Sequence, residues 1–154
     1  MQIQELMKKE IFTILPDATL REAISALLEH DISGLIVVND TNEVIGILSE
    51  KDIYRALYPT YQELFSNPEI YFSFENQEKE IESRANVLVK DVMTTDVIKV
   101  NSHEYVMKVG ALMLAKNIHR LPVVDEKGKL VGIISRGSIY RNLFRKKFHI
   151  IKKK

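Results

Sequence analysis

The sequence contains no cysteine, so disulfide bonds and thiolate metal sites are both excluded. It also lacks an excess of one charge, because 22 Lys and Arg residues nearly balance 21 Asp and Glu residues. A balanced chain has no overall electrostatic attraction to nucleic acid or to a charged membrane. We therefore expect neither of these among its partners, and a chain without cysteine suits a reducing compartment.

Long apolar runs are absent as well. The longest, such as residues 35–38, cover only a few positions, whereas a membrane-spanning helix needs about 20. The first ten residues are polar and charged, which predicts no secretory leader. These absences predict a soluble, cytoplasmic protein.

What the chain does contain is an internal repeat. Shifting the sequence by 86 residues aligns residues 6–58 with residues 92–144 without a gap and gives 13 identities, where chance gives a few. The identical pairs are Met7/Met93, Leu28/Leu114, Ile32/Ile118, Leu35/Leu121, Val37/Val123, Val38/Val124, Gly46/Gly132, Ile47/Ile133, Ser49/Ser135, Ile53/Ile139, Tyr54/Tyr140, Arg55/Arg141 and Leu57/Leu143.

Each copy shows the same predicted elements in the order β-α-β-β-α. In the first copy, apolar residues at helical spacing follow Thr19 and Glu22, which make a capping box. We expect the second helix of each copy to begin at Ser49 and at the equivalent Ser135. The predicted strands cover residues 12–14, 35–38 and 44–48 in the first copy, and 97–100, 121–124 and 130–134 in the second.

The repeat predicts an α/β (α+β) fold of two β-α-β-β-α units that share a core, because a copy of about 53 residues buries little surface alone. In the linker, Pro59, Asn67 and Pro68 are predicted to interrupt the structure. Residues 75–89 are predicted to form a charged helix, either a solvated spacer or a dimer contact. The expected domains are repeat 1 over 1–58, a partly helical linker over 59–88, repeat 2 over 89–144 and a basic tail over 145–154.

Three motifs identify a family when they are taken together. They are Val89-Lys90-Asp91-Val92-Met93-Thr94, Gly46-Ile47-Leu48-Ser49-Glu50-Lys51-Asp52 and Asn117-Ile118-His119-Arg120-Leu121-Pro122-Val123-Val124. In this order, inside a two-fold repeat, they resemble the CBS-domain family, named for cystathionine β-synthase. The resemblance covers the chain except residues 59–88 and the tail. The stretch from His119 to Val123 is similar to the nucleotide-sensing subunit of AMP-activated protein kinase.

The resemblance implies two domains related by a pseudo-two-fold axis, with nucleotide clefts between them, and association of two pairs into a disk-like dimer. Ligands across the family include AMP, ADP, ATP and S-adenosylmethionine. By the resemblance, the Asp of the family's Gly-x-x-Ser/Thr-x-x-Asp motif, which holds the ribose hydroxyls, corresponds to Asp52. A carboxylate suits that role because it can accept two hydrogen bonds from a cis-diol. Ser49, three residues earlier, is expected to reach the ribose or phosphate. A structural role stays open, because Ser-x-x-Asp is also a helix-capping pattern.

His119 and Arg120 are expected to bind phosphate, Arg as a planar fork and His as a hydrogen-bond donor. The alternative is two solvated residues before a strand. The family pattern places Asp52, His119 and Arg120 on one cleft, with adenine against the strand around Asp96, Val97 and Ile98. In the second cleft the corresponding residues are Ser138, Ser33 and Gly34, so its ability to bind a ligand is in doubt.

These inferences predict a regulatory, homodimeric module that senses an adenine nucleotide (AMP, ADP or ATP) and acts on a separate, unknown protein. We expect no enzyme activity, catalytic residue or metal, because hydrolase, zinc-protease, P-loop and dinucleotide motifs are missing. The four histidines are scattered without metal-ligand spacing. Three alternatives stay open: an assembly module without ligand, an S-adenosylmethionine sensor, and RNA, DNA or anionic-lipid binding through the basic tail.

Overall fold

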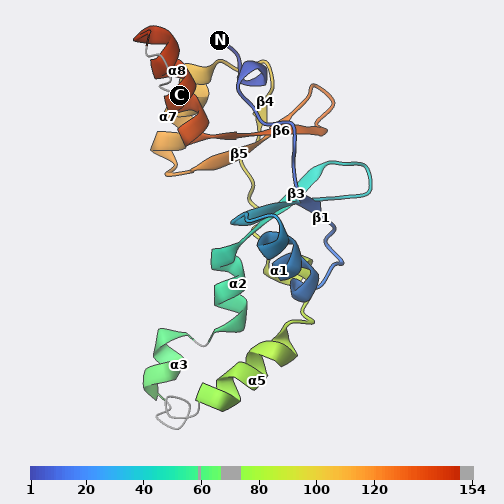
Figure 1. Ribbon diagram of the computed structural model, residues 1–154. Coiled ribbons are helices and arrows are strands. Elements are labelled where there is room, and N and C mark those ends of the chain that lie inside the picture. The colour runs from blue at the N-terminus through green and yellow to red at the C-terminus, as the bar shows by residue number, and fades with distance from the viewer. Residues whose placement is uncertain (59, 67–73, 150–154) are drawn as a thin grey trace. The chain divides into compact units, whose positions relative to one another are not determined.

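A computed structural model describes residues 1–58, 60–66 and 74–149, and the chain there folds as two compact units (Figure 1). Unit 1 contains Met1–Ile11, Thr41–Val44 and the chain from Ile98 onward, and unit 2 contains Phe12–Asp40 and Ile45–Val97. Within the described residues, each unit holds a three-stranded sheet with helices beside it. The predicted α/β (α+β) class with two β-α-β-β-α repeats is confirmed.

Unit 2 is built on the sheet β1-β2-β3, in which β1 runs parallel to β2. Helix α1 begins where predicted: the Thr19 hydroxyl accepts from the Glu22 N–H, and the Glu22 carboxylate accepts from the Thr19 N–H. The hydrogen bonds that the Glu22 carboxylate accepts from the Thr19 N–H and from the Thr19 hydroxyl lower the pKa of Glu22. The elements are β1 (Thr13–Ile14), α1 (Leu20–Glu29), β2 (Gly34–Val38), β3 (Val44–Ser49), α2 (Glu50–Leu57), α3 (Tyr61–Ser66), α5 (Phe74–Arg84) and α6 (Val89–Val92).

Unit 1 repeats this plan on the sheet β4-β5-β6, where β4 is parallel and β6 antiparallel to β5. The β5–β6 turn ends at Gly128, whose φ of 78° is in the left-handed region, and the equivalent Asn42 has a φ of 62°. The elements are η1 (Ile3–Glu5), β4 (Val100–Asn101), α7 (Val106–Ala115), β5 (Arg120–Val124), β6 (Leu130–Ser135) and α8 (Arg136–Lys147).

Each unit contains its own cluster of buried apolar residues. Each cluster is completed by the beginning of the other repeat. Ile3 of repeat 1 is fully buried in the core of unit 1, and Val89 of repeat 2 is fully buried in the core of unit 2. The repeats therefore exchange their first segments, which solves the problem that one copy alone buries too little surface.

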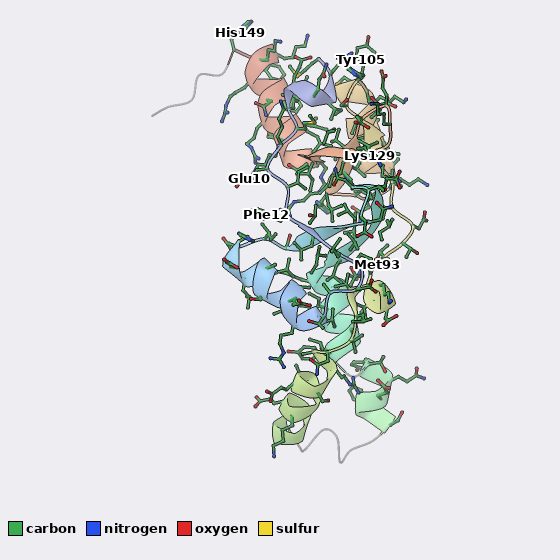
Figure 2. The ribbon with its side chains drawn as sticks, turned by 90° about the vertical axis from the view of Figure 1, so that its right-hand side faces the viewer. Glu10, Phe12, Met93, Tyr105, Lys129 and His149 are labelled. Atoms are coloured by element: carbon green, nitrogen blue, oxygen red, sulfur yellow. The ribbon has the colours of Figure 1, made fainter. Side chains whose placement is uncertain are left out.

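The exchanged segments add hydrogen bonds to the last strand of each sheet. Lys8 pairs with Ile133 of β6, and Thr94 pairs with Ile47 of β3, each through two backbone bonds of 2.9 Å. Figure 2 labels Glu10 and Phe12, between which the chain passes from unit 1 into unit 2, and Met93 on the second exchanged segment.

The close approach of these segments requires glycine at the matching strand position. A Cβ on Gly46 would overlap the Sδ of Met93 and lie 3.2 Å from the Thr94 carbonyl oxygen. A Cβ on Gly132 would lie 2.5 Å from the Sδ of Met7. The repeated Met and Gly thus form two contact pairs, each with one member from either repeat.

Gly46→Ala is therefore expected to reduce the free energy of unfolding by about 1–3 kcal/mol, the usual cost of overpacking. Urea denaturation measures the loss. Met93→Ala removes the overlapping side chain, so the further loss caused by Gly46→Ala should be smaller in that background. Equal losses in both backgrounds would contradict the contact.

Two local predictions differ from the structure. The strand expected over residues 97–100 is β4, Val100–Asn101. The helix expected over residues 75–89 ends at Arg84 and resumes as α6, because the N–H groups of Arg21 and Leu20 in α1 bind the carbonyls of Ala85 and Val87. Helix α3, which was not predicted, begins after a Thr60–Glu63 capping box.

Pro59, Asn67 and Pro68, the predicted interruptions of the linker, lie outside the described residues, as does the end of the basic tail. The earlier part of that tail, Arg145 to Lys147, forms the last turn of α8. Among the helices that the structure describes, none combines the length and apolarity needed to cross a bilayer.

Candidate functional site

Asp52 lies in the first turn of α2 and is 9% exposed. Its Oδ2 atom accepts from the Ser49 N–H at 2.8 Å and from the Ser49 hydroxyl at 2.7 Å. The Ser49 hydroxyl accepts in turn from the Asp52 N–H at 3.4 Å. The capping pattern considered as an alternative is thus present, and it fixes the carboxylate at the end of β3.

Thr94 is a further member of this group that sequence reasoning did not single out. Its hydroxyl donates to Oδ1 of Asp52 at 3.2 Å, and its backbone pairs with Ile47 of β3. The signal was its place at the end of the Val89-to-Thr94 motif, but only the segment exchange brings that motif to α2. Because Thr94 donates its hydroxyl proton to Asp52, the Thr94 oxygen still has lone pairs with which it can accept a hydrogen bond.

His119 and Arg120 lie in unit 1, at the start of β5. Arg120 pairs in register with Ser135, the residue that caps α8, and both His119 and Arg120 are exposed. The backbone N–H of Arg136 donates to the His119 carbonyl at 2.9 Å. The end of the β5–β6 ladder therefore carries three basic residues, and the side chains of two of them, His119 and Arg136, are in contact.

The contact between Arg136 and His119 assigns the histidine tautomer. An Arg136 guanidinium nitrogen lies 2.9 Å from Nδ1 of His119. A guanidinium can only donate, so Nδ1 must accept, and the proton of the neutral ring lies on Nε2. His119 thus presents an N–H donor beside the guanidinium group of Arg136. Arg136 was missed because it follows a helix cap, where a basic residue carries no distinctive pattern.

The segment expected to contact adenine belongs to no helix or strand. Asp96 and Val97 end the unit 2 part of the chain, and Ile98 begins the following part of unit 1. The Val97 N–H donates to the Thr95 carbonyl at 3.0 Å, so this amide is already engaged in a tight turn.

The predicted site residues are therefore divided between the units. Ser49 and Asp52 form one group in unit 2 with Thr94, and His119 and Arg120 form another in unit 1 with Arg136. Among the described residues, no three His, Cys, Asp or Glu side chains are close enough to hold a metal ion.

The equivalent positions of the other repeat lack these groups. Ser138 replaces Asp52, and its hydroxyl bonds to that of Ser135 at 2.9 Å. Ser33 and Gly34 replace the His–Arg pair, and Glu50 stands in the place of Arg136, its N–H donating to the Ser33 carbonyl at 3.2 Å. The second set of residues lacks the carboxylate and all three basic side chains, and it has Glu50 in the place of Arg136 and Lys8 in the place of Thr94.

Comparisons with known proteins identify the family. The model for the CBS domain matches residues 3–59 and again residues 89–145. Protein MJ1426 of Methanocaldococcus jannaschii is 31% identical over 154 residues, which cover 93% of this chain and 91% of that protein. The inosine-5'-monophosphate dehydrogenase of the same organism is also 31% identical, but the match covers 89% of this chain and 22% of the dehydrogenase.

Solved structures show the same fold. CBSX2 from Arabidopsis thaliana, a CBS-pair protein, is 26% identical and superposes with a TM-score of 0.75 over 96% of both chains. A structure of CBSX2 in complex with AMP superposes with a TM-score of 0.71 over 95% of this chain and 98% of its own. With two matched copies that together cover more than half of its length, the chain belongs to the CBS-domain family.

Proposed function

We propose that this chain is a regulatory module that binds one adenine nucleotide, AMP, ADP or ATP, and passes the bound state to a separate protein without catalysing a reaction. The observation that carries the proposal is the cluster of His119, Arg120 and Arg136 at the start of α8. Basic residues at one strand end supply the hydrogen-bond donors and the positive charge that a phosphate requires.

The group around Asp52 complements that cluster. Ser49 already donates twice to Oδ2 and Thr94 once to Oδ1, so Oδ1 has about one lone pair left for a ligand. Asp52 alone is then a poor bidentate acceptor. We propose that Oδ1 of Asp52 and the Thr94 oxygen, 3.2 Å apart, each accept one hydroxyl of the ribose diol.

In the proposed complex the two groups face one cleft, as the family pattern implies. The nucleotide's ribose lies at Asp52 and Thr94, its phosphate at His119, Arg120 and Arg136, and its base near Asp96, Val97 and Ile98. CBSX2, whose fold this chain shares at 26% identity, was solved with AMP, which supports this ligand class. A positively charged S-adenosylmethionine sulfonium suits three basic side chains less well than a phosphate does.

We further propose that the module works as a homodimer in the cytoplasm. A dimer gives the nucleotide-bound state a second surface through which to reach a regulated protein. An assembly module without ligand is the second candidate, since the buried Asp52 serves as a cap whether or not ribose binds.

A thermal-shift series separates these candidates. AMP, ADP or ATP at 100 times its dissociation constant should stabilise the ligand-free protein by about 2.7 kcal/mol, which is several degrees in Tm for a chain of this size. GMP and S-adenosylmethionine serve as the matched comparisons and should shift Tm less. No shift with any adenine nucleotide at millimolar concentration would leave the assembly module as the function.

A further inference from the structure

Methionine supplies all of the sulfur in this chain, because there is no cysteine. A peroxide converts the methionine thioether into a sulfoxide, which turns a flexible apolar side chain into a polar one. The sequence contains five methionines, which are Met1, Met7, Met93, Met107 and Met113. What oxidation does to the protein depends on where each sulfur lies.

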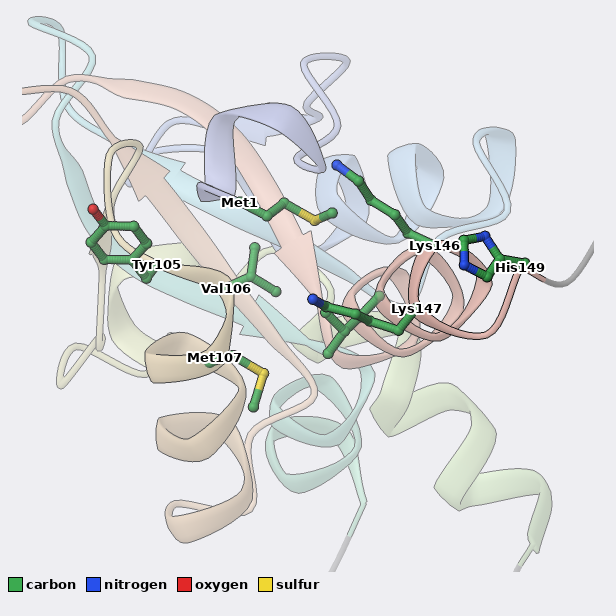
Figure 3. Close-up of a pocket in the computed structure, with 8 residues that line it drawn as sticks. Met1, Tyr105, Val106, Met107, Lys146, Lys147 and His149 are labelled. Carbon is green, nitrogen blue, oxygen red and sulfur yellow. The ribbon is translucent and has the colours of Figure 1, made fainter.

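Three of the five methionines lie where oxidation has little structural effect. Met113 is fully buried in the core of unit 1, so its sulfur is shielded from a dissolved oxidant. Met107 is 68% exposed. Figure 3 shows Met107 and Met1 lining a cavity of about 740 Å³ beside α7 and the end of α8. An oxygen atom added to either of these two sulfurs has open space to occupy.

Met7 and Met93 differ from the other three, because each half-buried sulfur packs against a strand glycine. The Sδ atom of Met93 fills the space that a side chain on Gly46 would need, and Met93 also packs against the core of unit 2. Met7 has the same relation to Gly132 and to the core of unit 1. A sulfoxide in either place must bury a polar oxygen or move away from the strand. Burial of an unpaired polar group is costly, so we expect the side chain to move away.

Met93 differs from Met7 in the residue that follows it. Thr94 bonds to β3 through its backbone and donates its hydroxyl to Oδ1 of Asp52 at 3.2 Å. Lys8 follows Met7 and makes the same backbone bonds to β6, but no carboxylate stands at the position equivalent to Asp52. Movement of Met93 therefore displaces a residue that holds the Asp52 carboxylate, whereas movement of Met7 does not.

We propose that Met93 is a sulfoxidation site through which a peroxide weakens nucleotide binding. The sulfur lone pair attacks one peroxide oxygen, and an S–O bond forms as the O–O bond breaks. The departing hydroxide takes the proton of the transferred oxygen and leaves as water, so the sulfur is oxidised and the peroxide is reduced. The regulation rests on the nucleotide site proposed above, which it makes sensitive to oxidants.

The effect on the ligand follows from the contacts of Thr94. When the Met93 sulfoxide leaves Gly46, the segment that carries Thr94 loses its packing on β3. The Thr94 hydroxyl then no longer holds Oδ1 of Asp52, and the ribose loses one of its two proposed acceptors. Methionine sulfoxide reductases return the sulfoxide to methionine, so the change is reversible.

Paired variants separate the two methionines. Met7→Leu leaves Met93 open to oxidation, and Met93→Leu leaves Met7 open, while leucine keeps a similar volume in the core. Each variant is treated with hydrogen peroxide, and mass spectrometry of tryptic peptides locates the sulfoxides. Calorimetric titration measures the affinity for AMP before and after treatment of the same variant. Oxidation of the Met7→Leu chain should weaken AMP binding by roughly 3- to 10-fold, the loss of about one neutral hydrogen bond.

Oxidation of the Met93→Leu chain should change AMP affinity little, although the same peptides from Met1 and Met107 carry sulfoxide. Methionine sulfoxide reductases A and B should restore the affinity of the oxidised Met7→Leu chain. Unchanged AMP affinity with Met93 fully oxidised, equal losses in both variants, or a Met93 that resists peroxide while Met107 is oxidised would overturn the inference alone. Failure of AMP to bind before treatment would overturn the proposed function and this regulation together.

Discussion

A calorimetric titration with AMP is expected to fill one site per chain, with any second site weaker by on the order of a thousandfold or more. The first proposed cleft offers Asp52, His119 and Arg120 together with Arg136. The second offers Ser138, Ser33 and Gly34, and it carries Glu50, which repels phosphate. Losing two or three charge-assisted contacts of about 1.5–3 kcal/mol each accounts for the difference in affinity.

Introducing the side chains of the first proposed cleft at the equivalent positions of the second provides the control. A chain with Ser138→Asp, Ser33→His and Glu50→Arg should gain a second, weaker site. Gly34 is left unchanged because a Cβ there would lie 3.2 Å from the Leu48 carbonyl oxygen. Two equivalent sites in the natural chain, or a crystal structure with nucleotide only beside Ser138, would contradict the assignment.

The second prediction with a large expected effect compares AMP with adenosine, in order to separate recognition of the phosphate from recognition of the ribose. Arg120→Ala should weaken AMP binding by roughly 10- to 100-fold, the equivalent of one charge-assisted contact of about 1.5–3 kcal/mol. Adenosine has no phosphate, so its affinity should change little. Isothermal titration of both ligands measures the two losses.

Asp52→Asn is the matched variant on the ribose side. Its amide keeps an oxygen to accept from Ser49, so the helix cap survives, but it accepts fewer hydrogen bonds than a carboxylate. Both AMP and adenosine contain the ribose diol and should weaken to a similar extent. If Arg120→Ala reduces AMP and adenosine binding equally, the phosphate role assigned to Arg120 is wrong.

The ungapped repeat was sufficient to predict most of the architecture. A match over 53 positions predicts the same order of elements in both copies, and short-range chemistry then sets several boundaries. Thr19, Ser49 and Ser135 cap helices where their patterns indicate, because a cap depends on residues three positions apart.

Contacts between distant parts of the chain were not predictable in this way. A repeat shows that Met7 and Met93 are equivalent but not which sheet each one joins, so the segment exchange and the place of Thr94 were missed. Helix α5 ends earlier than predicted because two N–H groups at the start of α1 bind carbonyl groups in the segment that follows α5. Arg136 was overlooked because its partner, His119, is 17 residues away and becomes a neighbour only through the β5–β6 pairing.

The exchanged first segments bear on how such a protein arises. A single repeat contains both a Met like Met7 and a strand glycine like Gly46, so two separate copies of it can satisfy each other by swapping their first segments. Gene duplication and fusion then turn that intermolecular swap into an intramolecular one, in which each segment meets its strand at high effective concentration. Once joined, the halves are free to diverge, one keeping His119, Arg120 and Arg136 and the other the carboxylate of Asp52. Neither half is then self-sufficient, and selection acts on the pair as one hereditary unit.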